Sequence, residues 1–311
     1  MFCVVTGGAG FIGSHLVDAL VARGDRVLVI DDLRAGSREN LAAHLESGAV
    51  ELCVADLLGD GWQEACRGAD LLYHLAADPD VRGSARSPQA VFDNNVTATE
   101  RVLEAMRTCG IPGLVFTSTS TVYGEATTIP TPENYAPLEP ISVYAATKLA
   151  GEALISAYCA TYGMRAWVFR FANIIGPRSG HGVIKDFIDK LRADPGELEI
   201  LGDGRQSKSY LDVRACIGAM QCVVNADPGP FAVYNIGSED WVDVRTIADT
   251  VVREMGLEGV AYRFTGGDRG WVGDVPRMLL SVEKLRNLGW QPEIGSAASV
   301  SAAVRAMLQS G

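Results

Sequence analysis

TGGAGFIG occupies residues 6–13 of this 311-residue chain and contains three regularly spaced glycines, Gly7, Gly10 and Gly13. The apolar run at residues 2–5 is typical of a buried strand, and residues 15–21 have the periodicity of a helix. Glycines between a strand and a helix allow a tight turn, and they let the backbone approach a pyrophosphate at the helix N-terminus. The stretch therefore predicts a doubly wound α/β sheet that binds a dinucleotide.

An acidic pair follows the second predicted strand, residues 26–30. Asp31 and Asp32 come about 20 residues after the glycines, where a carboxylate can accept hydrogen bonds from a ribose diol. Negative charge there would repel a 2′-phosphate, so the pair favours NAD over NADP. Arg34 and Arg38 lie close by and leave NADP open, and a helix-capping aspartate is the structural alternative.

Two further predicted strands, residues 50–57 and 71–77, end at positions that could also contact the cofactor. Asp56 could accept a hydrogen bond from an adenine amino group, and the small residues Ala76 and Ala77 leave room for a flat ligand. Ligands of open α/β sheets bind at the carboxyl ends of the strands. We therefore expect these positions to converge.

Hydroxyl residues and a tyrosine–lysine pair predict the chemistry. Thr117 to Thr121 follow a predicted strand at residues 114–116, although a solvated turn would also explain them. Tyr144 and Lys148 are four residues apart in a predicted helix from 142 to about 162, so they share one face. An ammonium and a positive nicotinamide ring both favour the phenolate. This predicts a tyrosine that transfers protons, in preference to a mere packing pair.

Taken together, these motifs resemble the extended short-chain dehydrogenase/reductase (SDR) superfamily, and more closely its nucleotide-sugar 4-epimerases of the UDP-glucose/UDP-galactose type. The resemblance runs over nearly the whole chain and includes TGGAGFIGSHLVDAL, HLAADPDVRGS, DNNVTAT, STSTVYGE, YAATK, RFANIIGPR and RGWVGDV. It implies a Rossmann-like NAD-binding domain in residues 1–172, to which a segment near 231–236 returns. Residues 173–311 would form a smaller mixed α/β substrate lobe, with predicted helices over 183–192, 241–256 and 281–288.

The same resemblance implies a cofactor site, a catalytic set and a substrate site. The cofactor residues would be Gly7, Gly10, Phe11, Ile12, Gly13, Asp31, Asp32, Leu33, Arg34, Ala35, Gly36, Asp56, Leu57, Leu75, Ala76, Ala77, Asn94, Tyr144 and Lys148. The catalytic residues would be Thr119, Tyr144 and Lys148. The residues that contact the nucleotide-sugar would be Thr119, Tyr144, Asn173, Lys208, Arg269, Asp274 and Met278.

Three of these substrate positions leave questions open. Lys208 stands where many relatives have arginine, and lysine keeps the charge but loses the bidentate fork. Trp271 takes the place of the arginine in the family's R-x-G-D motif, so a contact of Arg269 with the diphosphate is open. Met278 aligns with the position that admits or excludes N-acetyl sugars, and its flexible side chain does not decide between them.

The hydroxyl-rich segment favours one reaction within the superfamily. The 4,6-dehydratases and decarboxylases that the chain resembles have an acid where it has Ser120 and Thr121, and a neutral hydroxyl cannot replace that acid. We therefore expect 4-epimerisation of UDP-glucose and UDP-galactose through a transient 4-keto sugar. Epimerases of N-acetylated or uronic UDP-sugars and a net-redox NAD(P)-dependent reductase are the enzymatic alternatives. A non-catalytic dinucleotide sensor is the remaining one.

Composition limits the partners and the location. A net charge of −11 disfavours nucleic acid and anionic membranes as partners. Seven cysteines at scattered spacings favour a reducing cytoplasm, and no metal-ligand spacing is present. No apolar run approaches the roughly 18 residues that a membrane span needs, and the first predicted strand leaves no room for a signal peptide. The resemblance implies a homodimer formed through helices at about 93–108 and 142–162.

Overall fold

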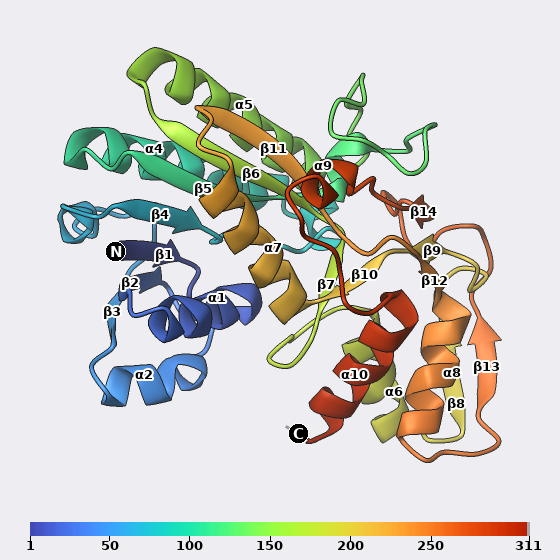
Figure 1. Cartoon of the computed structure of the whole chain (residues 1–311). Coiled ribbons are helices and arrows are strands. Elements are labelled where there is room, and N and C mark those ends of the chain that lie inside the picture. The colour runs from blue at the N-terminus through green and yellow to red at the C-terminus, as the bar shows by residue number, and fades with distance from the viewer. Residues whose placement is uncertain (310–311) are drawn as a thin grey trace. The chain divides into compact units, whose positions relative to one another are not determined.

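The protein is described here by a computed structural model that covers residues 1–309 (Figure 1). The chain forms two compact units that alternate along the sequence. Unit 1 comprises residues 1–122, 142–170 and 220–234, and unit 2 comprises 123–141, 171–219 and the described residues from 235 on. The expected division between residues 172 and 173 would place each half of the sequence in its own domain. In the structure, residues 123–141 belong to unit 2 and residues 220–234 belong to unit 1.

A seven-stranded sheet runs through unit 1 in the order β11-β6-β5-β4-β1-β2-β3. Its strands are β1 Phe2–Thr6, β2 Arg26–Asp31, β3 Val50–Val54, β4 Leu71–His74, β5 Gly113–Thr119, β6 Arg165–Phe171 and β11 Phe231–Ile236. β1 pairs in parallel with both β2 and β4, and β4 pairs in parallel with β5. This order confirms the predicted doubly wound, Rossmann-like sheet.

Helices connect the strands of unit 1. They are α1 Phe11–Ala22, α2 Ala42–Glu46, α3 Pro88–Phe92, α4 Ala98–Cys109 and α5 Val143–Tyr162, and α7 Val213–Ala226 passes from unit 2 into unit 1. Figure 1 shows α4 and α5 side by side, and Met106, Phe116 and Ile155 are buried in the core there. The Ser142 hydroxyl accepts a hydrogen bond from the Ala145 N–H, which caps α5 and confirms its predicted start.

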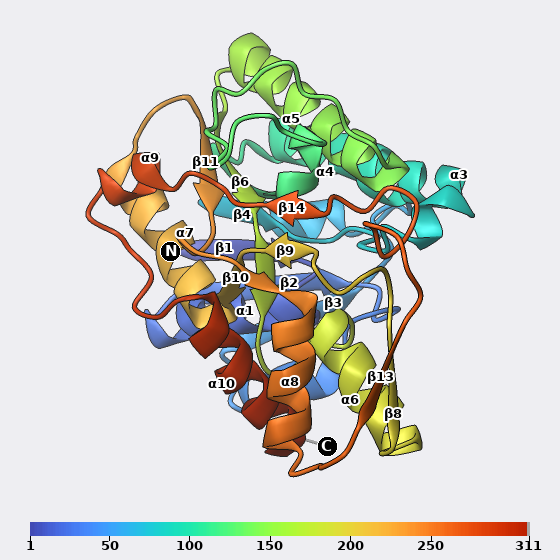
Figure 2. The same ribbon diagram turned by 90° about the vertical axis from the view of Figure 1, so that its right-hand side faces the viewer.

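Unit 2 contains short strand pairs and a group of three helices. β7 Asn173–Ile175 pairs with β10 Tyr210–Asp212, β8 Glu197–Ile200 pairs with β13 Ala261–Phe264, and β9 Ser207–Lys208 lies between β12 Val242–Asp243 and β14 Arg277–Met278. Its helices are α6 Val183–Ala193, α8 Val244–Glu254, α9 Glu283–Arg286 and α10 Ser296–Gln309. Figure 2 shows α6, α8 and α10 side by side over a core that includes Ile188, Val251 and Val304. The predicted mixed α/β lobe is confirmed.

The predicted helix at 281–288 is wrong in its length. Only Glu283–Arg286 is helical. The backbone N–H of Ser281 donates to the Thr131 carbonyl at 2.9 Å, and Leu280 bridges to Thr131, so this stretch begins as extended chain. A partner from residues 123–141 therefore overrides the local helical tendency.

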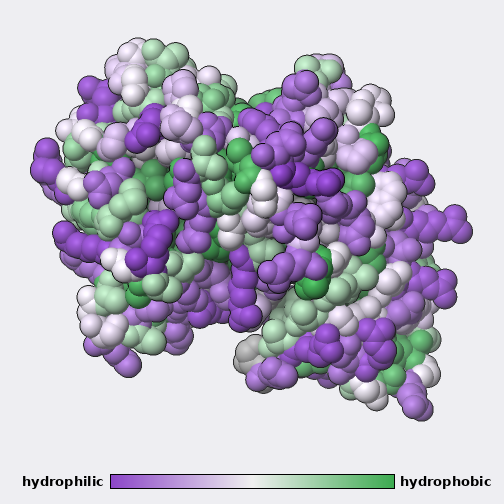
Figure 3. All heavy atoms as spheres, in the orientation of Figure 1, coloured by the Kyte–Doolittle hydropathy of each residue, from purple (hydrophilic) through white to green (hydrophobic). Residues whose placement is uncertain are grey.

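The face of the molecule in Figure 3 carries mostly polar groups. Hydrophilic residues cover much of the face in Figure 3, and hydrophobic residues lie among them in small groups. Within residues 1–309, none of the helices combines the length and the apolar character that crossing a membrane requires. The same residues contain no group of three His, Cys, Asp or Glu side chains that could hold a metal ion.

Candidate active site

The turn between β1 and α1 requires glycine at the predicted positions. Gly7 has a φ of +72°, and a Cβ there would lie 2.6 Å from the Ala76 nitrogen. A Cβ on Gly13 would overlap the Gly7 carbonyl oxygen. The turn is therefore narrow, and the free N–H groups at the start of α1 offer a site for the pyrophosphate of a dinucleotide.

The acidic pair after β2 lies next to this turn. The buried Asp31 carboxylate accepts hydrogen bonds from the N–H groups of Ala9 at 2.9 Å and Leu33 at 2.8 Å. Burial raises the pKa of Asp31, and these two backbone donors oppose that rise. A carboxylate has about four lone-pair sites, so Asp31 retains capacity for a ribose hydroxyl.

Arg34, the residue that left NADP open, has two acidic partners. Its guanidinium lies 3.0 Å from Asp32 and 3.2 Å from Asp56. These contacts neutralise a cation that would otherwise attract a 2′-phosphate, so the local charge favours NAD. Gly36 completes this loop, because a Cβ there would lie 2.8 Å from the Ala9 carbonyl carbon.

Strands β3 and β4 end earlier than predicted, at Val54 and His74. Asp56 accepts a hydrogen bond from the Leu58 N–H at 2.9 Å and so begins a turn instead of ending a strand. After β4, the Leu75 N–H donates to the Thr6 carbonyl and Ala76 lies against Gly7. The predicted cofactor residues of both loops thus lie at the carboxyl ends of their strands.

His74 supports this edge of the sheet. Its Nδ1 lies 2.7 Å from the Thr6 hydroxyl, and its Nε2 lies 3.0 Å from the Thr99 hydroxyl. Thr99 donates its proton to the Asn95 carbonyl, so Nε2 is assigned as the protonated nitrogen of His74. Burial and the charge of Lys148 lower the pKa of His74 to about 3. The imidazole is therefore neutral and holds the strand ends together.

The residues that were predicted to be catalytic lie around the end of β5. The Lys148 ammonium donates to the Thr117 carbonyl at 2.9 Å and lies 4.9 Å from the centre of the Phe116 ring. Burial raises the pKa of Tyr144 to about 12, and a hydrogen bond with Thr119 opposes this rise. Burial also lowers the pKa of Lys148 to about 8, and Glu152 opposes that change. Thr117 to Ser120 are buried, which excludes a solvated turn.

Two adjacent asparagines have different surroundings. The Asn94 side chain donates to the Ala90 carbonyl of its own helical segment at 2.8 Å. Asn95 is buried in a π-helical turn, where it accepts the Asp78 N–H at 2.7 Å and donates to the Thr147 hydroxyl at 3.0 Å. Asn95 thus connects the loop after β4 to α5. Asn95 was not predicted, because the motif DNNVTAT contains both asparagines and does not show which is buried.

In unit 2, the predicted substrate residues gather around β9. Met278 on β14 pairs with Lys208 on β9. The Lys208 ammonium lies 2.5 Å from an Asp274 carboxylate oxygen and 5.3 Å from the centre of the Trp271 ring. Asp274 is buried, and its second carboxylate oxygen accepts the Gly270 N–H.

Arg269 and Asn173 also contact the residues around β9. Arg269 donates to the Asp274 carbonyl at 3.1 Å and to the Glu125 carboxylate at 2.7 Å. The Asn173 side chain donates to the Ser209 carbonyl, and the Ser209 N–H donates to the Met278 carbonyl. Residues from three separate parts of the sequence, at 173, 208 and 269–278, are therefore neighbours within unit 2. Glu125 was not predicted, because its partner lies 144 residues away.

Residues 3–237 match the family described as NAD dependent epimerase/dehydratase. The chain belongs to this family. UDP-glucose 4-epimerase of Mycolicibacterium smegmatis is 31% identical over 98% of this chain and 97% of its own length. A crystal structure of UDP-galactose 4-epimerase is 43% identical, covers 100% of this chain and 99% of its own, and superposes with a TM-score of 0.90. The UDP-glucuronic acid 4-epimerase of Bacillus cereus, with UDP-glucuronic acid and NAD, is 26% identical, covers 100% of both chains and has a TM-score of 0.91.

These comparisons confirm the resemblance to the extended SDR epimerases and the prediction of NAD. The residues of this epimerase/dehydratase fit that cofactor. The glycine turn leaves a narrow cradle for a pyrophosphate, Asp31 can accept a ribose hydroxyl, and Arg34 is already neutralised. Tyr144 and Lys148 lie at the carboxyl end of the same sheet, where the nicotinamide is expected.

Proposed function

We propose that this protein catalyses the NAD-dependent 4-epimerisation of a UDP-sugar, with UDP-galactose and UDP-glucose as its substrates. Two contacts at the end of β5 carry this proposal: Tyr144 is hydrogen-bonded to Thr119, and Lys148 donates to the Thr117 carbonyl. Ser120 and Thr121 support simple epimerisation, because dehydration or decarboxylation would need an acid at these positions. The activity would belong to galactose metabolism.

Bound NAD would supply a hydride acceptor for C4 of the sugar and a hydride donor for the opposite face, so the net redox change would be zero. Tyr144, hydrogen-bonded to Thr119, removes the proton of the C4 hydroxyl and gives a proton back in the second half. The protein by itself holds Tyr144 protonated, so the phenolate depends on nearby positive charge. Lys148 supplies such a charge and is held in place by the Thr117 carbonyl.

We assign the group around β9 to the nucleotide-sugar. Lys208 and Arg269 would attract the diphosphate, which a chain of net charge −11 can hold only through local cations. Asp274 orients Lys208, Asn173 would donate to the substrate, and Met278 would limit the size of the sugar substituent. The partners Asp274 and Glu125 keep both cations in fixed positions before a substrate arrives.

The decisive experiment incubates the purified protein with UDP-galactose, without added cofactor, and follows C4 inversion by NMR. We expect conversion to UDP-glucose, and no conversion by the Tyr144→Phe variant. Absence of conversion by the wild-type protein, even after NAD is added, would contradict the proposal. A requirement for added NADH or NADPH, with net formation of a reduced product, would identify a reductase instead.

A uronic sugar is the second candidate substrate. The similarity to the UDP-glucuronic acid 4-epimerase of Bacillus cereus over both entire chains favours it. Parallel incubations with UDP-glucuronic acid and UDP-N-acetylglucosamine test this candidate. The ratio of kcat/KM values between substrates measures the preference, and a higher value for either analogue would replace our first assignment.

We also propose that the protein acts as a cytoplasmic homodimer. The seven cysteines are free thiols, which suits a reducing compartment. The outer face of α5 exposes small side chains at Ala146, Ala153, Ala157 and Ala160. A helix of a second copy could approach such a face closely.

A further inference from the structure

A buried ion pair lies next to the catalytic residues and has no part in the mechanism above. Glu152, one turn after Lys148 on α5, faces Arg170 on β6. The Arg170 guanidinium lies 2.6 Å from one Glu152 oxygen and its Nε lies 3.0 Å from the other. Each side chain is only 6% exposed. Buried pairs often contribute little net stability, because desolvation offsets their attraction. Stability alone therefore does not account for this pair.

The pair belongs to a row of contacts between α5 and β5. Three successive residues at the end of the strand contact three residues that are one turn apart on the helix. The contacts are the Thr119 hydroxyl with Tyr144, the Thr117 carbonyl with Lys148, and the Ser118 hydroxyl with Glu152. Arg170 anchors the last of these to β6. A shift of α5 along the sheet would break all three contacts together.

Charge points to the same role. Lys148 is buried, with Tyr144 and Glu152 one turn away on either side of it on α5 and His74 nearby on β4. His74 is neutral, and Arg170 acts on this group through its ion pair with Glu152. Glu152 supplies the negative charge that raises the pKa of Lys148 against the effect of burial.

We propose that Glu152 is a positioning residue which, held by Arg170 and Ser118, keeps Lys148 charged and in register with Tyr144. The effect of Glu152 on turnover rests on the proposed epimerase function. The effect of Glu152 on the charge of Lys148 does not rest on that function, so the two effects can be tested separately.

The first test measures the ionisation of Lys148 directly. The chain has five lysines, namely Lys148, Lys185, Lys190, Lys208 and Lys284, so ¹³C-labelled lysine gives few NMR signals. The Lys148 signal is assigned by its loss in Lys148→Met. We expect it to titrate well below the pH range of exposed lysines, whether or not any substrate is turned over.

Two variants should then shift this titration in opposite directions. Glu152→Gln keeps size and hydrogen bonding but removes the negative charge, so Lys148 should titrate about 1 unit lower. Arg170→Gln removes the positive charge that partly neutralises Glu152, so Lys148 should titrate higher. Both changes leave one buried charge without its partner and should lower the melting temperature alike. The double variant should restore part of the stability and bring the titration back toward the wild-type value.

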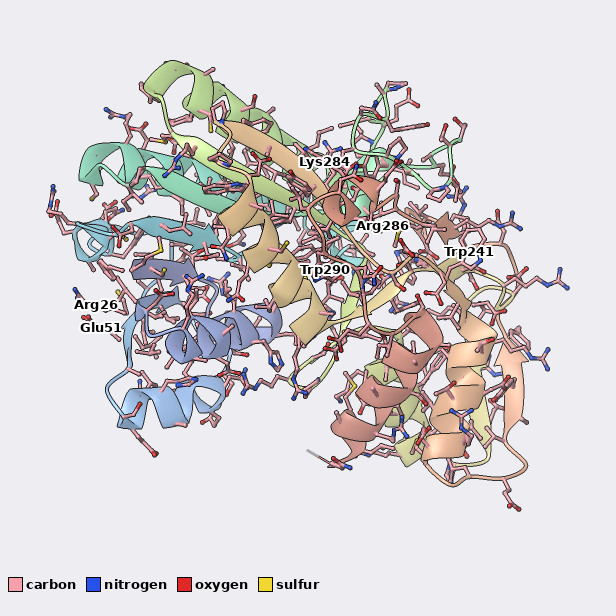
Figure 4. All side chains as sticks on the ribbon, viewed as in Figure 1. Arg26, Glu51, Trp241, Lys284, Arg286 and Trp290 are labelled. Carbon is pink, nitrogen blue, oxygen red and sulfur yellow. The ribbon has the colours of Figure 1, made fainter. Side chains whose placement is uncertain are left out.

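Asp25→Asn is the matched control. Asp25 is a buried carboxylate that pairs with Arg23 and the N-terminal amine. It directly precedes Arg26, the first residue of β2, at the amino edge of the sheet. Figure 4 shows Arg26 there with its ion-pair partner Glu51. This edge is opposite to the one that holds Lys148, so the control should not change the Lys148 titration.

The pH profile of kcat then links the charge to catalysis. Its alkaline limb should move down for Glu152→Gln and up for Arg170→Gln, by the same amounts as the NMR titration. Equal shifts in one direction, or no shift in either variant, would overturn the proposal. If Glu152→Gln does not fold, the Lys148 titration and the pH profile of kcat are measured on Ser118→Ala and on the double variant instead. A normal titration pattern without any epimerisation would instead contradict only the proposed function.

Discussion

Burial acts in the same sense on Tyr144 and Lys148, because it favours the neutral form of each side chain. Catalysis needs the opposite, a phenolate beside an ammonium. The Thr119 hydroxyl and the Glu152 carboxylate are the groups that oppose burial at each residue. The hydroxyl-rich strand end thus contributes through its contacts with α5.

Removing the phenol of Tyr144 tests its role directly. Tyr144→Phe keeps the ring but cannot transfer a proton, so kcat should fall by about 10²–10⁴-fold. NAD should remain bound, which is measured as nucleotide released from the denatured protein. Tyr162→Phe is a matched control, because it removes the same phenolic hydroxyl from an exposed tyrosine at the end of α5. Near-normal turnover by Tyr144→Phe would contradict the assignment of the base.

The ionisation of Lys148 predicts an alkaline limit. The pKa of Lys148 is lowered to about 8, so the ammonium is present below that pH and is lost as the pH rises through it. We expect kcat with saturating UDP-galactose to fall over the same range. Lys148→Arg stays charged to a much higher pH. The kcat of this variant is compared with that of the wild type at each pH. An alkaline fall in kcat at the same pH in both proteins would assign this fall to another group.

We expect the turn from β1 to α1 to hold the cofactor, and the geometry of this turn depends on Gly13. Gly13→Ala should displace α1, because the added methyl group meets the Gly7 carbonyl oxygen. We expect loss of bound NAD and a lower melting temperature. Gly180→Ala is the control, because a Cβ at Gly180 has no atom within 4 Å. Retention of NAD by Gly13→Ala would show that the turn does not hold the pyrophosphate.

Local signals predict elements well where partners are close in the sequence. The strand–turn–helix at residues 2–22 and the capped helix from Ser142 needed only their own residues to be identified. Helix α10 was not predicted, because alanine and serine make up most of it and give little apolar signal. Helix α7 was also not predicted, although its buried residues Ile217, Met220 and Val223 have helical spacing. The end of β3 was misplaced because Asp56 forms a turn through its own side chain.

For the molecule as a whole, the proposed homodimer gives the simplest test. Sedimentation equilibrium should give twice the 33.1 kDa mass of the chain. Ala153→Glu places a charge on the exposed face of α5 and should favour the monomer, because burying an unpaired charge is costly. Ala298→Glu, on an exposed position of α10, should leave the mass unchanged. A monomeric wild-type protein would contradict the proposal.

Residue types and spacings were enough to predict the sheet, a bound dinucleotide, and the pair of Tyr144 and Lys148, to which the resemblance added Thr119. Each of these depends on a short motif whose chemistry is local. The grouping of Asn173, Lys208, Arg269 and Asp274 was implied by resemblance, and the structure supplied the contacts that unite them. The exchange of segments between the two units, the burial of Asn95 and the pair of Glu152 with Arg170 became visible only in the tertiary structure. Their partners are distant in the sequence, and only folding brings such side chains within hydrogen-bond distance.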